Sequence, residues 1–182
     1  MGKRILLSAA LLAFSLTAGV SANWITGNPT VLAVSHGEAA FQTALSNDQR
    51  LAVNLRAEDT AAADIVFSTQ ASSSVLTLSS LPVSVSSDDN QDAQVRITPL
   101  VNDGNGFRFY LVETGNGSGS SIVSYKRGNF ASAFIPSDAE DADASFEVTK
   151  KEVLFHVTRE GNTDTYGLVL NAKDGTFTAQ KK

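Results

Sequence analysis

Short runs of alternating or β-branched residues recur roughly every ten residues along most of this chain, and each run is closed by a cluster of Gly, Asn, Asp or Ser. This spacing predicts antiparallel strands, so we expect an all-β chain that forms a single antiparallel β-sandwich or a flattened barrel. The expected strands are Thr30–Ser35, Arg50–Arg56, Asp64–Thr69, Ser74–Ser79, Ala93–Thr98, Phe107–Glu113, Ser121–Lys126, Ala144–Thr149, Glu152–Arg159, Thr165–Asn171 and Thr176–Gln180.

The pattern is clearest in residues 144 to 180. Val153, Phe155 and Val157 alternate with other residues, which predicts a strand with one apolar face. The pair Asp174-Gly175 favours the positive φ angles of a tight hairpin turn. We therefore predict a C-terminal β-meander of four strands.

Two regions leave the type of element open, and one loop is conspicuous. Residues Glu38 to Leu45 fit a helix and a strand about equally well, because apolar residues recur there at both spacings. Ala57 to Ala63 is rich in alanine and fits one helical turn. The Gly- and Ser-rich residues 115 to 121 predict a flexible connection.

The amino terminus has the three parts of a secretory signal peptide. Lys3 and Arg4 precede an apolar run from Ile5 to Val20, and small residues lead up to Ala22. The alternative is a permanent membrane anchor, but the run is shorter than the roughly 20 apolar residues that span a bilayer. We expect cleavage after Ala22, so that residues 1–22 are the signal peptide and the protein is exported to the periplasm or the cell exterior.

The remaining residues, 23–182, are predicted to form a single all-β domain, because this length suits one hydrophobic core. Two of the 14 Lys and Arg residues lie in the signal peptide, so 12 remain against 19 Asp and Glu, a net charge of −7. Such a surface disfavours binding to nucleic acid or to an anionic membrane surface. The chain has no cysteine, which excludes disulfides and thiolate chemistry.

The order of elements between Glu38 and Val101 resembles a Calx-beta or related immunoglobulin-like (Ig-like) module. The segments that carry the resemblance are residues 40–46, 51–55, 60–64 and 95–97, although Ile65 stands where that family usually has an aromatic residue. The resemblance implies a sandwich with loops that bind calcium. It leaves the rest of the chain unaccounted for, and we assign no family membership on it.

The sequence offers few residues for catalysis. The two histidines are interpreted as a turn residue, His36, and a residue on the outer face of a strand, His156. Ser118 lies in the glycine-rich loop but lacks the Gly-x-Ser-x-Gly setting of a hydrolase nucleophile. A pair of carboxylates acting as in glycosidases is not specified by any motif. We therefore assign no catalytic residue and no cofactor.

Oxygen-rich clusters provide the only metal candidates. Calcium prefers carboxylate and amide oxygens, and two acidic loops, residues 88–92 and 138–143, contain them. The turn at residues 102–106 also contains Asp103 and two asparagines, but it fits a hairpin better than an EF-hand loop. We assign no metal ligand, and whether the two loops bind calcium stays open.

Three further features concern surfaces. Trp24 follows the predicted cut closely, and we expect it to dock into the sheet rather than remain free for a partner. The frequent use of phenylalanine indicates core packing rather than a sugar-binding surface. A basic strip would form only if the strands of its members were neighbours; those members are Arg96, Arg108, Lys126 and Arg127.

The expected function is that of an exported, non-enzymatic binding or structural protein, with a protein or glycan of the envelope as its partner. One alternative is a pilus-like assembly subunit that donates a strand, residues 28–35, to a neighbour. Another alternative is a hydrolase that uses a pair of carboxylates. The sequence specifies neither the ligand nor the oligomeric state.

Overall fold

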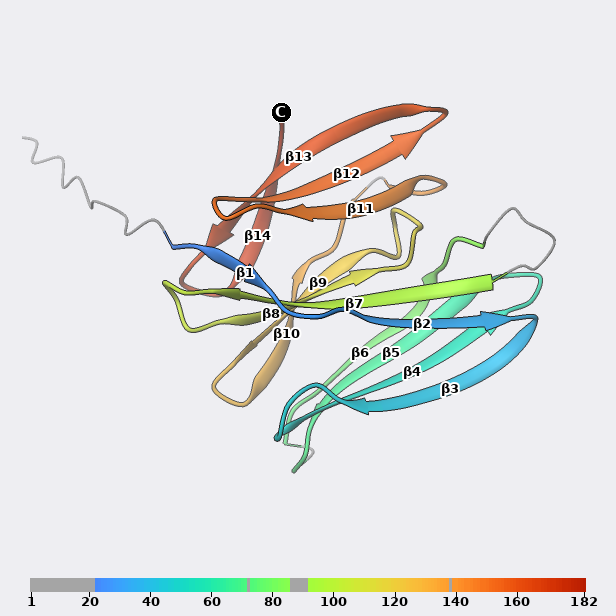
Figure 1. Cartoon of the computed structure of the whole chain (residues 1–182), viewed down its shortest axis with the longest axis horizontal. Helices are drawn as coiled ribbons and strands as arrows, with labels where there is room; N and C mark the ends of the chain where they lie inside the picture. Colours follow the sequence, from blue (N-terminus) through green and yellow to red (C-terminus); the bar gives the residue numbers. More distant parts are fainter. Residues whose placement is uncertain (1–21, 72, 86–91, 138) are drawn as a thin grey trace, which may run out of the picture.

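The computed structural model describes residues 22–182 with the exception of 72, 86–91 and 138. All regular elements in this part of the chain are strands, and they form three antiparallel sheets (Figure 1). The all-β prediction is therefore confirmed. The flattened-barrel alternative is wrong, because none of the three sheets closes on itself. Within the described residues no helix has the length and hydrophobicity needed to cross a membrane.

The N-terminal sheet is a meander of four strands in the order β3-β4-β5-β6. Its strands are β3 (Gly37–Ala44), β4 (Gln49–Ala57), β5 (Ala62–Thr69) and β6 (Val75–Pro82). Strand β4 is paired on both sides from Arg50 to Arg56, and every second residue from Leu51 to Ala57 is buried. This alternation is what one apolar face requires.

The central sheet contains β7, the longest strand in the described part of the chain. Five of the six strands of this sheet follow the order β1-β7-β8-β9-β10, and the sixth, β2, also pairs with β7. Both β1 and β2 pair with the same side of β7, one after the other. The strands are β1 (Trp24–Thr26), β2 (Thr30–Ser35), β7 (Asp92–Asn102), β8 (Arg108–Glu113), β9 (Ser121–Lys126) and β10 (Asn129–Phe134).

The C-terminal sheet is a meander of four strands, as predicted for residues 144 to 180. Its strands are β11 (Asp143–Val148), β12 (Val153–Arg159), β13 (Asn162–Asn171) and β14 (Thr176–Lys181). Phe155 of β12 stands opposite Phe146 on one side and Tyr166 on the other, so aromatic side chains line the same face of three strands.

The central sheet lies between the other two sheets (Figure 1), and a hydrophobic core packs against each of its faces. Along β8, Tyr110 and Val112 join the first hydrophobic core, whereas Phe109 and Leu111 join the second. Successive strand residues point to opposite faces, so one strand serves two cores. The sequence of β8 is accordingly a continuous apolar run and not an alternating one.

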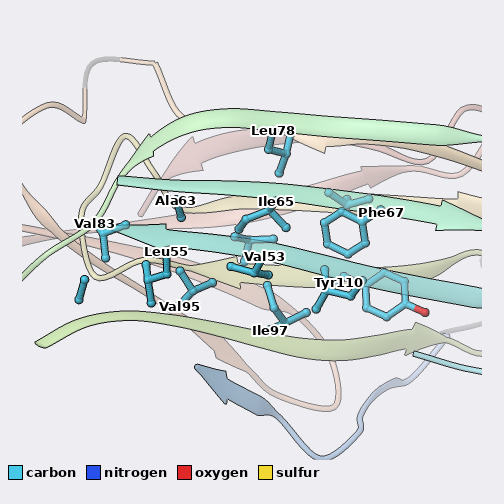
Figure 2. Close-up of a cluster of buried hydrophobic side chains, with 14 of the residues drawn as sticks. Val53, Leu55, Ala63, Ile65, Phe67, Leu78, Val83, Val95, Ile97 and Tyr110 are labelled. Atoms are coloured by element: carbon cyan, nitrogen blue, oxygen red, sulfur yellow. The ribbon is translucent and has the colours of Figure 1, made fainter. Parts of the chain in front are cut away.

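The first core fills the space between the N-terminal sheet and the central sheet. Figure 2 shows Leu55, Ile65 and Phe67 of the N-terminal sheet packed with Val95 and Ile97 of β7. All five side chains are fully buried.

The second core lies between the central and C-terminal sheets and is rich in aromatic rings. Trp24 docks there as predicted: its ring centroid lies 5.7 Å from that of Phe109 and 5.8 Å from that of Phe177. Every described phenylalanine is buried or half-buried, which confirms that these residues serve as packing. The contribution of such rings is large because each removes an extended apolar surface from water.

The two regions of open element type contain strand residues and no helix. Residues Glu38 to Leu45 form β3 up to Ala44, because β4 pairs with this segment along its whole length. The predicted helical turn at Ala57 to Ala63 is wrong: Ala57 ends β4, and Ala62 and Ala63 begin β5. These three alanines are buried in the strands, so tertiary packing overrides the helix propensity of alanine. Strands β1 and β10 were not predicted.

The glycine-rich loop at residues 115–121 is packed between elements, which contradicts its interpretation as a flexible connection. Ser120 and Ser121 are buried, and Ser120 donates its backbone N–H to the carbonyl of Asn116 over 3.1 Å. The N–H of Ala144 donates to the carbonyl of Gly115 over 2.8 Å, which ties the loop to β11. Glycine here serves close packing and not flexibility.

Candidate functional site

A groove opens between the edge of the central sheet and the inner face of the C-terminal sheet. Its volume is about 610 Å³, which lies within the roughly 300–1,000 Å³ of small-molecule sites. Strand β10 and the segment that follows it form one wall, and β12, β13 and β14 form the other. The described lining residues are Ser132–Ser137, Ala139, Phe155, Val157, Arg159, Tyr166 and Phe177–Ala179.

The deep part of the groove is apolar and belongs to the second core. Phe134, Phe155, Val157 and Phe177 are all buried there. The rings of Phe134 and Phe155 meet edge to face, with centroids 5.3 Å apart. The groove therefore exposes one margin of the aromatic second core.

An irregularity in β10 creates the first wall. The pairing of β10 with β9 shifts register between Ser132 and Phe134, so that Ala133 and Phe134 are both buried in the second core. Such a bulge bends a strand and locally ends its pairing. Ile135 then lies 62% exposed at the mouth of the groove, and Pro136, which has no N–H to donate, follows it.

The second wall changes character along β12. Arg159 continues the same face as Phe155 and Val157, because residues two apart in a strand point to the same side. At the same end of the sheet, Lys181 forms an ion pair with Asp164 at 2.8 Å, and this contact raises the pKa of Lys181. The inner face of the C-terminal sheet thus passes from core packing to charge where the central sheet no longer covers it.

The mouth of the groove combines hydroxyl groups with a cation. Ser132, Ser137 and Thr178 are exposed, and Tyr166 is half-buried. Of the described lining residues, Arg159 is the one that carries a formal charge, in a chain whose net charge is −5. A guanidinium has five N–H donors and can hold a ligand oxygen in addition to a protein partner.

A second cleft, which is lined by charged residues, lies where the central sheet meets β11, and its volume is about 360 Å³. Glu113 contacts Arg96 at 3.6 Å and accepts a hydrogen bond of 3.0 Å from the backbone N–H of Phe146. Asp92 lines the same cleft, but Glu113 stands opposite Arg96, four residues farther along β7. The hydrogen bond of Glu113 to β11 joins the central sheet to the edge strand of the C-terminal sheet, so we interpret this contact as structural.

The residues weighed for catalysis lie apart from the groove. His36 has φ of 47° and forms the turn between β2 and β3, as expected. His156 lies on β12, where its ring contacts Thr165 at 3.0 Å and Glu147 at 3.2 Å. The hydroxyl of Ser118 donates to the side-chain oxygen of Asn116 over 2.9 Å. The structure brings neither histidine to this serine.

The four basic residues that would form a strip if their strands were neighbours do not all lie together. Strands β7, β8 and β9 are neighbours, but Arg96 stands opposite Glu113 at one end of the β7–β8 ladder and Arg108 stands opposite Val101 at the other. The ammonium of Lys126 lies 3.8 Å from the ring centroid of Phe107, on the second core. A basic strip that includes Arg96 is therefore excluded.

The acidic loops are only partly within the described residues. Asp88, Asp89, Asn90 and Asp138 lie outside them. Among the residues that the structure does describe, no group of three or more His, Cys, Asp or Glu could hold a metal ion. Asp92 accepts a hydrogen bond from Ser35, and the turn at 102–106 joins β7 to β8 as a hairpin.

Comparison with protein-family models, with curated proteins and with solved structures returned no significant match. The function is therefore argued from geometry. Sequence reasoning missed the groove, because its walls come from two sheets and from a strand that was not predicted. The one signal available was Arg159, a charge at a position where the alternation of β12 requires an apolar residue.

Proposed function

We propose that the protein is an exported, non-enzymatic binding protein that holds a small amphipathic molecule in the groove between β10 and the C-terminal sheet. The observation that carries this proposal is the groove itself, which joins an apolar interior to a polar, cationic mouth. Export is proposed from the amino-terminal pattern of residues 1–22, of which only Ala22 lies within the described residues.

The occupant is inferred from the chemistry of the lining. Phe134, Phe155 and Phe177 offer an apolar contact surface that suits rings or alkyl groups. The guanidinium of Arg159 favours an anionic head group over a cationic one. A molecule with both parts satisfies the interior and the mouth together, which neither a simple sugar nor a simple anion would do.

The scaffold supports a binding role. Each core lies between two antiparallel sheets, which we interpret as two β-sandwiches that share the central sheet, in place of the single Ig-like sandwich expected. Pairing within the chain favours a self-contained molecule over a strand-donating subunit, because Thr30–Ser35 forms β2 in its own central sheet. Binding to a protein or glycan of the envelope stays a prediction. Hydrolysis by a pair of carboxylates also stays a prediction, and we assign no site to either function.

A pair of fluorescent probes tests the proposal on the mature chain. The probes are 8-anilinonaphthalene-1-sulfonate, which has an apolar body and an anionic head, and the uncharged N-phenyl-1-naphthylamine. We expect saturable binding of one molecule per chain for both probes, with a Kd of about micromolar magnitude. Ala179→Trp fills the groove from β14 and should weaken both probes about tenfold or more.

Two further variants make this test specific. Ala131→Trp places the same indole on an exposed position of β10 outside the groove and should leave both affinities unchanged. Arg159→Gln should weaken the anionic probe roughly three- to tenfold and spare the neutral one, because it removes a charge-assisted contact. Equal loss in the two tryptophan variants, or no saturable binding by the folded protein, would sink the proposal.

A further inference from the structure

The first residue after the predicted cut is held by a carboxylate. The backbone nitrogen of Asn23 donates to Asp103 Oδ1 over 2.7 Å, and its side-chain Nδ2 lies 3.5 Å from Oδ2. In return, the N–H of Asp103 donates to the carbonyl of Asn23 over 3.2 Å. Asp103 belongs to the hairpin turn between β7 and β8, so this turn is hydrogen-bonded to the first residue of the predicted mature chain.

The position of Asn23 is fixed by the next residue of the chain. Trp24 is buried in the second core, and its backbone N–H donates to the carbonyl of Lys150 over 3.1 Å. Strand β1 begins at this tryptophan, which stands opposite Asn102 in the ladder with β7. Because the core holds Trp24, the nitrogen of Asn23 stays beside Asp103 whether or not residues 1–22 are attached.

Cleavage would change the chemistry of that nitrogen. Hydrolysis of the Ala22–Asn23 peptide bond consumes one water and leaves a carboxylate on Ala22 and an amino group on Asn23. An α-amino group has a pKa of about 7.7–8.0, so it is largely protonated at neutral pH. The neutral amide hydrogen bond to Asp103 would thereby become a charge-assisted contact, which is the stronger kind.

We propose that Ala22–Asn23 is the processing site and that its product, the α-ammonium group of Asn23, forms an ion pair with Asp103 that anchors β1. Processing itself thus adds a stabilising contact to the folded chain. This inference rests on the proposed export but not on the groove, and its test leaves the groove untouched.

The other charged groups near this end are accounted for. A recess beside Ala22 and Trp24 is lined by three lysines, of which Lys182 pairs with Glu152 and Lys181 with Asp164. The third of these lysines is Lys151, and Lys150 precedes it in the chain. These cations oppose a positive charge on Asn23, whereas Asp103 favours it at hydrogen-bond distance. Distance decides in favour of Asp103, because Coulomb energy falls as separation grows.

The first measurement is the mass of the protein exported by a bacterial host from the full-length gene. The expected mass is that of the chain beginning at Asn23. A chain that begins at any other residue overturns the proposal, whatever the groove binds.

The second measurement is a double-mutant cycle on two chains, one starting at Asn23 and one starting at Ser21, each with and without Asp103→Asn. In the chain that starts at Asn23, the substitution should raise the unfolded-to-folded ratio about two- to fivefold at pH 6.5. In the longer chain the effect should be smaller, because Asn23 there contributes only an amide. Asp59→Asn, an exposed carboxylate in the turn between β4 and β5, controls for the change in net charge.

The pH dependence supplies a readout that a merely structural turn residue would not move. The partner carboxylate raises the pKa of the amino group on folding, so the added stability is complete below about pH 7.7 and is lost as pH rises through the folded-state value. The difference between the two chains should therefore vanish by about pH 10. An equal effect of Asp103→Asn in both chains, or a difference that does not change with pH, overturns the proposal.

Discussion

At the scale of single residues, one polar pair within the first core ties two sheets together. Gln49 is fully buried, and its side-chain oxygen accepts a hydrogen bond from the hydroxyl of Tyr110. The carbonyl of Gln49 also accepts the N–H of Leu45 over 3.0 Å, which closes the β3–β4 hairpin. Burial raises the pKa of Tyr110 to about 12. The pair therefore links the hairpin of the N-terminal sheet to β8 at a fixed point.

Removing this hydroxyl should destabilise the protein. Tyr110→Phe leaves the side-chain oxygen of Gln49 buried without this donor, so we expect the free energy of unfolding to fall by about 1 kcal/mol. Urea denaturation at pH 7 measures it. Tyr166→Phe, on the half-buried margin of the C-terminal sheet, is the control and should have a smaller effect. An equal loss in the two variants would contradict the role assigned to the pair.

The same tyrosine also predicts how stability depends on alkaline pH. Between about pH 10 and pH 12 the unfolded chain has lost a phenolic proton that folded Tyr110 retains. The unfolded state then binds fewer protons, so stability falls as pH rises through this window. The fall should be shallower in Tyr110→Phe. It should not disappear, because the hydrogen bond to Asp48 also raises the pKa of Tyr125.

At the scale of elements, the glycine-rich loop after β8 joins parts of all three sheets. A Cβ added to Gly119 would overlap the carbonyl of Pro82, at the end of β6, and the hydroxyl of Thr114. The loop also contacts β11 through Gly115. Glycine at position 119 is therefore required by the close approach of backbone from another sheet.

Gly119→Ala should lower the free energy of unfolding by about 1–3 kcal/mol, because backbone atoms cannot move aside cheaply. Gly167→Ala is the matched control, since its Cβ would meet chiefly the flexible end of the Lys182 side chain, at 3.1 Å. We expect that variant to stay within about 0.5 kcal/mol of the parent. Thermal or urea unfolding measures the free energy of unfolding of both variants. Similar losses in the two would contradict the assigned role of the loop.

At the scale of the whole molecule, the two cores share one sheet. Strand β8 sends Tyr110 and Val112 into the first core and Phe109 and Leu111 into the second. Loss of either core exposes one face of the central sheet, which then lacks an apolar partner. We expect the mature chain to unfold as one cooperative unit, as the prediction of a single domain requires.

The single tryptophan of the chain makes this testable, because Trp24 belongs to the second core. Leu55→Ala opens a cavity in the first core and should cost about 2–5 kcal/mol. The transition followed by Trp24 fluorescence should shift together with that followed by far-UV circular dichroism. If the fluorescence transition stays at its parent midpoint while the dichroism shifts, the two cores unfold independently.

Sequence by itself determined what is local. Alternation such as Val153-Leu154-Phe155, together with turn pairs such as Asp174-Gly175, predicted the strands and the C-terminal meander, because side-chain period and turn chemistry depend on near neighbours. The pattern did not predict strand β10, because it is rich in alanine and serine and its bulge interrupts the alternation.

Only the tertiary structure decided which faces met. Whether β8 would be buried on one face or on both depends on a second sheet more than thirty residues away along the chain. The groove likewise needs Phe134 and Phe155 to face each other from different sheets. The hydrogen bond of Asn23 needs Asp103, in a turn 80 positions later. Contacts of this kind arise from the packing of apolar faces, which excludes water without regard to distance along the sequence.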